Sequence, residues 1–276
     1  MSETRHRMPR VGIVGAGNMA TALVRGFLRA RLYRPKEILV SDTDPVKRRL
    51  ASRRLGVRTT AENVEVVEKT RTVVLAVKPQ VLDSVLEEIR PAVTGRHLVV
   101  SIAAGVSTAR IEGRLGEAAR VVRVMPNTPA LLGRGMSVLV RGRRATVGDQ
   151  RLALKLFRAV GSALAVERED LLDPVTGLAG SGPAYVYRFA EALIAGGEKA
   201  GLPLPLAQKL ALETLLGAAH MLVESGESPQ RLREMVTSPG GTTLAGLEEL
   251  ERRGFFEAVV AAIEAATRRS RELGGS

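Results

Sequence analysis

Short runs of β-branched residues alternate with amphipathic segments between residues 10 and 170, and this alternation restricts the fold more than any other feature. Most runs are apolar along their whole length, as expected for strands buried on both faces of a parallel sheet. They are RVGIVG (10–15), EILVS (37–41), TVVLAV (72–77), HLVVSI (97–102), ARVVRVM (119–125), SVLVRG (137–142) and ALAVE (163–167). The pattern predicts a doubly wound α/β domain with a mostly parallel sheet, spanning residues 1–170.

The pattern changes after residue 170, where alanine and leucine replace the β-branched runs. Two long segments, 184–201 and 205–226, are apolar on almost every side, and Pro205 and Gly226 are expected to mark the ends of the second. A helix without a polar face has to be buried, and roughly a hundred residues rarely bury two such helices by themselves. The sequence therefore predicts an all-helical second domain over residues 171–276 that a partner chain completes.

A glycine-rich turn follows the first expected strand and opens a helix. Its sequence, GAGNMA, has the G-x-G-x-x-A spacing, in which Gly15 allows a tight turn, Gly17 admits a diphosphate and Ala20 lets helix pack on strand. Free N–H groups at the start of the helix would bind the diphosphate. The first domain is thus predicted to be of the Rossmann type. The residues expected at the dinucleotide are Gly15, Ala16, Gly17, Asn18, Met19 and Ala20.

The end of the second expected strand bears on the choice of dinucleotide. Asp42 stands where a carboxylate accepts the 2′-hydroxyl of NAD. Thr43, Lys47 and Arg48 follow it and could instead meet the 2′-phosphate of NADP. The choice between NADH and NADPH stays open at this point.

Three other segments follow expected strands and should lie at the same edge of the sheet as Gly15. They are residues 76–79, 103–106 and 125–129. Ligands of doubly wound sheets bind at this carboxyl edge. In the third segment, two prolines flank Asn127 and Thr128 and predict a stiff loop rather than a helix.

Residues 238–243, which read SPGGTT, connect two segments of helical pattern. Pro239 and the glycine pair predict a tight turn, and Thr242 or Thr243 is expected to cap the next helix. Free backbone N–H groups beside hydroxyls predict a receptor for a small carboxylate. The alternative is a capped helix start without a ligand. The segment GLAGSGPAYV (177–186) has the same chemistry around Ser181.

The composition excludes several kinds of catalysis. The chain has no cysteine, and therefore no disulfide framework, thiolate metal site or cysteine nucleophile. Its histidines are His6 near the N-terminus, His97 at a strand start and His220, expected to be buried within an apolar helix. No metal site or histidine-based triad is predicted. The reaction should need little proton chemistry from side chains, as hydride transfer to a protonated imine does.

The net charge of +12 raises the question of nucleic acid as a partner. The basic residues are scattered, and five Phe, three Tyr and no Trp leave few rings for stacking on bases. Nucleic acid is therefore not expected. Since no apolar stretch approaches ~18 residues, a membrane span is not expected either, and the cytoplasm is the expected location.

Eight stretches together resemble pyrroline-5-carboxylate reductases. They are GIVGAGNMA, LAVKPQ, VVSIAAGV, RVMPNTPAL, GLAGSGPAY, GLPLPLA, LLGAAHML and MVTSPGGTTLAGLEELERRGF, in this order. The resemblance implies reduction of (S)-1-pyrroline-5-carboxylate to L-proline, the last step of proline synthesis, with NADPH or NADH. It also implies a homodimer formed through the helical domain, often assembled further into decamers.

The resemblance assigns further residues by position. Cofactor contacts would extend to Asp42, Asn63, Ala76, Val77, Lys78, Pro79 and Ala104. Substrate contacts would come from Ser181, Gly240, Gly241, Thr242 and Thr243. Thr243 would offer its hydroxyl to the ring nitrogen, with Ser238 as the second catalytic candidate. Some members of the family have serine where Asp42 stands, and an acid there repels a 2′-phosphate.

Two other interpretations remain. A β-hydroxyacid dehydrogenase shares the glycine turn and a helical second domain, but it uses a lysine on the inter-domain helix. No lysine occurs here between Lys155 and Lys199. A nucleotide-sensing or nucleic-acid-binding protein would leave SPGGTT and GSGPAY unexplained.

Overall fold

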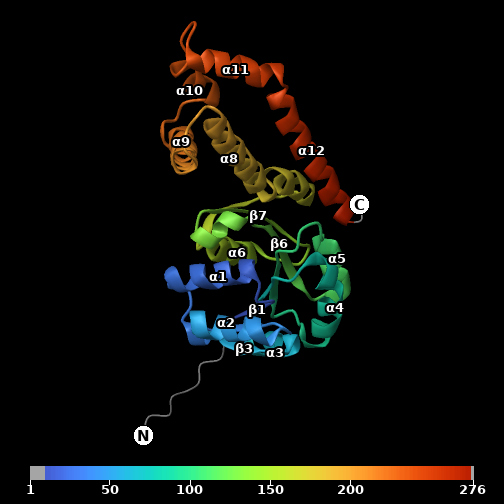
Figure 1. The fold of residues 1–276 in the computed structure, drawn as a ribbon. Coiled ribbons are helices and arrows are strands. Elements are labelled where there is room, and N and C mark those ends of the chain that lie inside the picture. The colour runs from blue at the N-terminus through green and yellow to red at the C-terminus, as the bar shows by residue number, and fades with distance from the viewer. Residues whose placement is uncertain (1–9, 275–276) are drawn as a thin grey trace. The chain divides into compact units, whose positions relative to one another are not determined.

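The computed structural model describes residues 10–274, which divide into two compact units (Figure 1). The first unit contains the chain up to Ser181 together with residues from Ala265 onward, and the second is Gly182–Glu264. This division by contacts falls later than residue 170 and gives the end of the last helix to the first unit. A functional boundary at residue 170 remains a prediction.

The described part of the first unit is built on an eight-stranded sheet of order β3-β2-β1-β4-β5-β6-β7-β8. Neighbouring strands are parallel except for the antiparallel pair β6 and β7. The doubly wound α/β prediction is confirmed. The strands are β1 Val11–Val14, β2 Ile38–Ser41, β3 Arg58–Thr60, β4 Thr72–Leu75, β5 Leu98–Ser101, β6 Arg120–Met125, β7 Gly135–Arg141 and β8 Gly161–Ala165.

Strand β3 was not predicted from the sequence. It has three residues at the edge of the sheet, and none of them is buried. A strand this short and exposed has no apolar run by which to recognise it. The central strands β1, β2, β4 and β5 are buried at every position, as their continuous apolar runs predicted.

Helices cover both faces of the sheet (Figure 1). On one face, Ile13 and Val74 pack with Leu23 of α1 and Phe157 of α6. On the other face, the neighbouring strand residues pack with α3, α4 and α5. The helices are α1 Asn18–Arg29, α2 Pro45–Leu55, α3 Asn63–Lys69, α4 Pro79–Ile89, α5 Thr108–Leu115, α6 Val147–Arg158 and α7 Leu172–Val175, with 3₁₀ helices η1 Pro35–Glu37, η2 Arg90–Ala92, η3 Thr128–Leu132 and η4 Glu169–Leu171, and a π turn, η5 Thr176–Gly180.

The second unit is helical, as predicted. Its helices are α8 Gly182–Lys199, α9 Leu204–Glu224, α10 Pro229–Met235, α11 Thr242–Arg252 and α12 Phe255–Gly274, the last of which ends in the first unit. Helix α9 begins one residue before the expected Pro205, with Pro203 as its N-cap. None of the helices in the described residues is long and apolar enough to cross a membrane.

Helices α8 and α9 keep much of their apolar surface exposed in the single chain. Large exposed side chains include Leu212, Leu216 and Val223, and α8 has no buried residue. His220 is not buried within the single chain: its side chain is 56% exposed and its Nδ1 lies 2.7 Å from Glu224 Oε1. The reason is that no other part of the described chain covers this stretch of α9.

Candidate active site

The carboxyl ends of four neighbouring strands form one row. Val14 is in register with both Ser41 and Leu75, and Leu75 is in register with Ser101. The chain leaves all four strands at the same level. The predicted cofactor segments after β1, β2, β4 and β5 therefore lie along one edge. The order of the strands reverses between β1 and β4: β2 and β3 lie on one side of β1, and β4 and β5 lie on the other. Ligands of doubly wound sheets bind at this point of reversal.

The glycine turn has space for a ligand on one side and close contact on the other. Gly15 has φ +98°, and a Cβ on it would lie 2.7 Å from the carbonyl oxygen of Ala76, so only glycine fits. A Cβ on Gly17 would meet no atom within 4 Å. Gly17 is also the N-cap of α1, which has neither a capping side chain nor an acidic residue in its first turn. Its first N–H groups and the open space beside Gly17 fit a diphosphate.

The carboxylate of Asp42 lies against this turn. Its Oδ2 accepts a hydrogen bond from the N–H of Ala16 at 2.8 Å, and its Oδ1 accepts one from the N–H of Asp44 at 2.9 Å. Arg48 donates from Nη1 to the carbonyl oxygens of Asp42 and Thr43. Lys47 Nζ lies 3.8 Å from the Asp42 carboxylate. Arg48, one of the residues that could meet a 2′-phosphate, thus donates to the backbone instead.

Asn63 is placed beside the same edge, but its amide is already bonded. It is 7% exposed; its Oδ1 accepts from Ser41 Oγ at 2.7 Å, and its Nδ2 donates to Glu88 Oε2 at 2.8 Å. Because the carboxamide has a second N–H and a second oxygen lone pair, a cofactor contact from Asn63 could use these without displacing either partner. Of the other cofactor candidates, Ala76 and Val77 follow β4, Lys78 is the N-cap of α4, Pro79 is its first residue, and Ala104 follows β5 half-buried.

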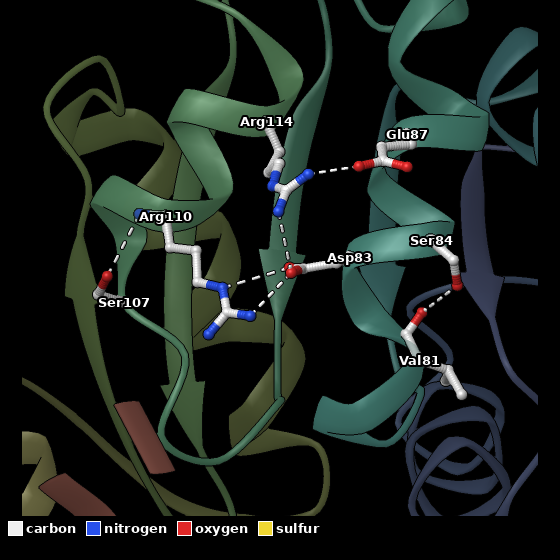
Figure 2. Close-up of polar contacts among 7 residues, drawn as sticks. All are labelled: Val81, Asp83, Ser84, Glu87, Ser107, Arg110 and Arg114. Atoms are coloured by element: carbon white, nitrogen blue, oxygen red, sulfur yellow. Dashed lines mark hydrogen bonds and ion pairs between the residues drawn. The ribbon is translucent and has the colours of Figure 1, made fainter. Parts of the chain in front are cut away.

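Helices α4 and α5, which follow two of these edge segments, are joined by a charged cluster (Figure 2). Arg110 donates to Asp83 from Nε at 3.2 Å and from Nη2 at 2.8 Å. Arg114 donates to both Asp83 and Glu87. The bonds from Arg110 hold the pKa of the Asp83 carboxyl below its usual range. The cluster links α4 to α5 at the surface of the unit.

The segment around Ser181 differs from the expected helix start. Residues Thr176–Gly180 form a π turn, and the N–H of Ser181 donates to the carbonyl of Thr176 at 2.9 Å. The backbone N–H of Ser181 is therefore not free for a carboxylate, although its side chain is half-buried at the end of the turn. The loop expected over residues 125–129 is non-helical up to Asn127, after which a short 3₁₀ helix runs over Thr128–Leu132.

The SPGGTT stretch forms the expected tight turn. Pro239 and Gly240, with φ +69°, occupy its centre, and the N–H of Gly241 donates to the carbonyl of Ser238 at 3.0 Å. A Cβ on Gly241 would lie 2.5 Å from Ser238 Oγ, so the serine hydroxyl lies over the glycine. Helix α11 begins at Thr242 with Gly241 as an N-cap that has no capping side chain. The expectation of a threonine cap was therefore wrong, and the first N–H groups of α11 are open to an anion.

Two other features lie away from these motifs. A surface cavity of about 620 Å³, lined in part by Arg10, Tyr33, Arg71 and Arg96, opens at the amino-terminal edge of the sheet, opposite the glycine turn. Burial lowers the pKa of His97, which is fully buried at the start of β5. Among residues 10–274 no cluster of His, Asp and Glu is arranged to hold a metal.

A doubly wound sheet whose glycine turn fits a diphosphate, followed by a helical unit, is the architecture of a dinucleotide-dependent oxidoreductase. Residues 10–105 match the family described as NADP oxidoreductase, coenzyme F420-dependent, and residues 169–273 match that described as pyrroline-5-carboxylate reductase dimerisation. Pyrroline-5-carboxylate reductase 3 of Mus musculus is 44% identical over 99% of both chains. The reductase of Synechocystis is 43% identical over 96% of this chain and 98% of its own.

A solved structure agrees with these relatives. The Plasmodium falciparum pyrroline carboxylate reductase, crystallised with NADP bound, superposes with a TM-score of 0.87 at 31% identity, covering 98% of this chain and 99% of its own. The chain belongs to the pyrroline-5-carboxylate reductase family.

Proposed function

We propose that this protein reduces (S)-1-pyrroline-5-carboxylate to L-proline with NADH or NADPH. The observation that carries the proposal is the start of α11. Its N–H groups are uncapped, Ser238 Oγ lies over Gly241, and Thr243 stands in the first turn. This arrangement offers a carboxylate several backbone donors and offers an adjacent ring nitrogen a hydroxyl.

The chain's own residues bind and orient. The Gly15–Ala20 turn holds the diphosphate of the cofactor, whose reduced nicotinamide supplies the hydride when bound. The backbone at Gly240, Thr242 and Thr243 binds the substrate carboxylate, since the N–H of Gly241 already donates to the carbonyl of Ser238. The hydroxyl of Thr243 accepts a hydrogen bond from the protonated imine nitrogen, and Ser181 and Ser238 complete the polar contacts. Because the imine is already protonated, no side chain has to deliver a proton during hydride transfer.

Asp42 bears on the choice between the two cofactors. Its carboxylate is positioned by two backbone N–H groups and is 11% exposed, and Arg48 is bonded to carbonyl oxygens. A negative group fixed at the end of β2 favours a ribose hydroxyl over a 2′-phosphate. We therefore expect NADH to be used at least as well as NADPH.

The assembly is part of the proposal. The exposed apolar side chains of α8 and α9 are expected to pack against the same helices of a second chain, giving a homodimer that can assemble further into a decamer. Apolar patches of this extent on one chain usually mark an interface. A cytoplasmic location, where the nicotinamide pool and amino-acid precursors are available, is also proposed.

One assay tests the function directly. Oxidation of NADH and of NADPH would be followed in parallel with pyrroline-5-carboxylate as the substrate. Turnover with one or both cofactors is expected, and its absence with both, in protein that binds the cofactor, would contradict the proposal.

A 3-hydroxy acid with NAD tests the dehydrogenase alternative. A DNA mobility shift at several salt concentrations tests the nucleic-acid alternative, and no shift is expected.

A further inference from the structure

Strand β6 and the residue two positions beyond it contact one segment of the chain at three points. Arg123, Met125 and Asn127 are spaced by two, the period that places strand residues on one face. Arg123 is ion-paired with Glu169, Met125 reaches Gly180, and Asn127 bonds to Ala179. The segment from Glu169 to Ser181 therefore packs on the sheet of its own unit.

The beginning of this segment is fixed by charge. Arg123 is 5% exposed, and its Nη1 lies 3.0 Å from Glu169 Oε1. The same carboxylate accepts from the N–H of Thr108 at 2.7 Å and from its hydroxyl at 2.6 Å. Arg123 Nη2 also lies 3.9 Å from Asp173, which accepts from Ser270 Oγ. Each charged group has a partner, as burial requires.

The end of the segment is fixed by one amide. Asn127 Nδ2 donates to the carbonyl oxygen of Ala179 at 3.0 Å, and its Oδ1 accepts from the N–H of Met136 at 2.8 Å. A carboxamide carries a donor and an acceptor on one planar group, which neither a carboxylate nor a hydroxyl does at the same spacing. Asn127 thus ties the π turn to the start of β7.

The π turn is the element that needs this support. Such turns are rare and occur frequently at functional sites. Gly180 lets Met125 approach, because a Cβ there would lie 2.4 Å from Met125 Cε. If the turn reverted to α-helical spacing, the loss of one residue from it would rotate Ser181 by about 100° around the helix axis.

We propose that Asn127 is a positioning residue, which sets the orientation of Ser181 toward the substrate by holding the carbonyl of Ala179 in the π turn. This rests on the proposed function, in which Ser181 binds pyrroline-5-carboxylate. Asn127 acts through Ala179 and leaves the glycine turn untouched. Replacing Asn127 should therefore raise the KM for the imine and leave the Kd for the dinucleotide unchanged.

The test compares Asn127→Ala and Asn127→Asp with the wild-type full chain. We expect the KM for pyrroline-5-carboxylate to rise about tenfold in Asn127→Ala and further in Asn127→Asp, where two acceptor oxygens face each other. The Kd for NADH, measured by titration calorimetry, should change by less than twofold. An unchanged KM, or a Kd that rises by the same factor, would overturn the proposal.

Two further variants distinguish an effect on the orientation of Ser181 from a general loss of stability in this region. Val138→Ala opens a cavity in the apolar cluster that packs on Leu172, and should lower the thermal stability while leaving the KM unchanged. An equal rise in KM in Val138→Ala would mean that any loss of stability in this region raises the KM.

In a Ser181→Ala background, Asn127→Ala should add little to the KM, since both changes remove the same contact. Full additivity would show that Asn127 does not act through Ser181.

The experiments distinguish an error in the proposed function from an error in the role given to Asn127. If the wild-type protein does not turn over pyrroline-5-carboxylate, the proposed function is wrong. If it does, and Ser181→Ala has a normal KM, the positioning of Ser181 is overturned while the function stands.

Discussion

The carboxylate of Asp42 accepts a hydrogen bond from the backbone N–H of Ala16, with 2.8 Å between oxygen and nitrogen. The residue expected to contact the cofactor ribose is therefore also a support of the glycine turn. A second bond from the N–H of Asp44 fixes the carboxylate from the other side. The side chain predicted to influence the choice of cofactor thus also holds the backbone of the turn.

Replacing Asp42 by serine should shift the preference toward NADPH. Removing a fixed negative charge near the 2′-position should favour NADPH by about tenfold in the ratio of kcat/KM values, or ~1.4 kcal/mol. Titration calorimetry with each dinucleotide should give the same change. Asp44→Ser is the matched control: it removes a charge two residues away and keeps an N-cap side chain for α2. A ratio that stays constant in Asp42→Ser would show that the ribose is recognised elsewhere.

Gly17→Ala should fold normally and bind the dinucleotide poorly. The residue has φ −75° and open space around its Cβ position, so the protein itself meets no strain. The methyl group would occupy the space into which the diphosphate approaches, and the Kd for NADH should rise at least about tenfold. Gly113→Ala, which also meets no atom within 4 Å, should leave the Kd unchanged. Equal affinities for the two variants would place the diphosphate away from Gly17.

Thr243→Ala should lower kcat without unfolding the chain. A hydrogen bond to the reacting group that acts in the transition state is worth ~2–4 kcal/mol, or roughly 30- to 1000-fold in rate. The helix should be unaffected, because Gly241 and not Thr243 is its N-cap. Thr243→Ser retains the hydroxyl and should keep most of the activity. Normal steady-state kinetics in Thr243→Ala would remove this residue from the mechanism.

The charged cluster between α4 and α5 should make a pH-dependent contribution to stability (Figure 2). Hydrogen bonds from Arg110 lower the pKa of Asp83 in the folded state. The pair therefore stabilises above the unfolded pKa, about 4, and its contribution is lost as the pH falls through the lower folded pKa. Asp83→Asn should cost ~0.5–1 kcal/mol at pH 7 after solvent screening, and progressively less as the pH falls through the folded pKa. Thermal unfolding of both proteins across this range, at low and high salt, is the measurement. A pH-independent difference would mean that the amide disturbs packing rather than charge.

The apolar face of α9 should hold subunits together. Leu212 and Leu216 are 56% and 55% exposed in the single chain. Leu216→Glu would place a charge in the proposed interface and should shift the protein toward monomer at micromolar concentration, as measured by light scattering. Val147→Glu, on α6 of the first unit, should not change the mass. A monomeric wild-type protein at that concentration would contradict the proposed dimer.

Patterns that depend on neighbouring residues could be predicted from the sequence. The apolar runs of β1, β2, β4 and β5 identified the buried centre of the sheet, and the GAGNMA turn identified the edge that fits a dinucleotide. The tight turn at Pro239 and Gly240 was also predicted, because proline fixes φ for the start of a turn and glycine adopts the positive φ that other residues avoid. The three residues of β3 carried no such signal.

The points at which the prediction was wrong depend on contacts between distant residues. A threonine cap was chemically reasonable, yet the helix begins at Thr242 and Gly241 is its N-cap, with Ser238 Oγ where a side chain would be. The π turn before Ser181 contacts Asn127 and Met125, which lie some fifty residues earlier in the chain. His220 was expected to be buried because its neighbours are apolar, but burial depends on what packs against a helix.

The sequence by itself determined the class of fold, the edge of the sheet that carries the glycine turn, and the tight turn before α11, because each follows from periodicity, from the backbone freedom of glycine or from the fixed φ of proline. The tertiary structure alone decided that Asp42 holds the glycine turn, that Arg48 is bonded to carbonyl oxygens, and that Asn127 supports the π turn. These contacts join residues far apart in the chain or set one side chain among several possible partners. Only the folded backbone brings such groups within hydrogen-bonding distance, so no local pattern in the sequence reveals them.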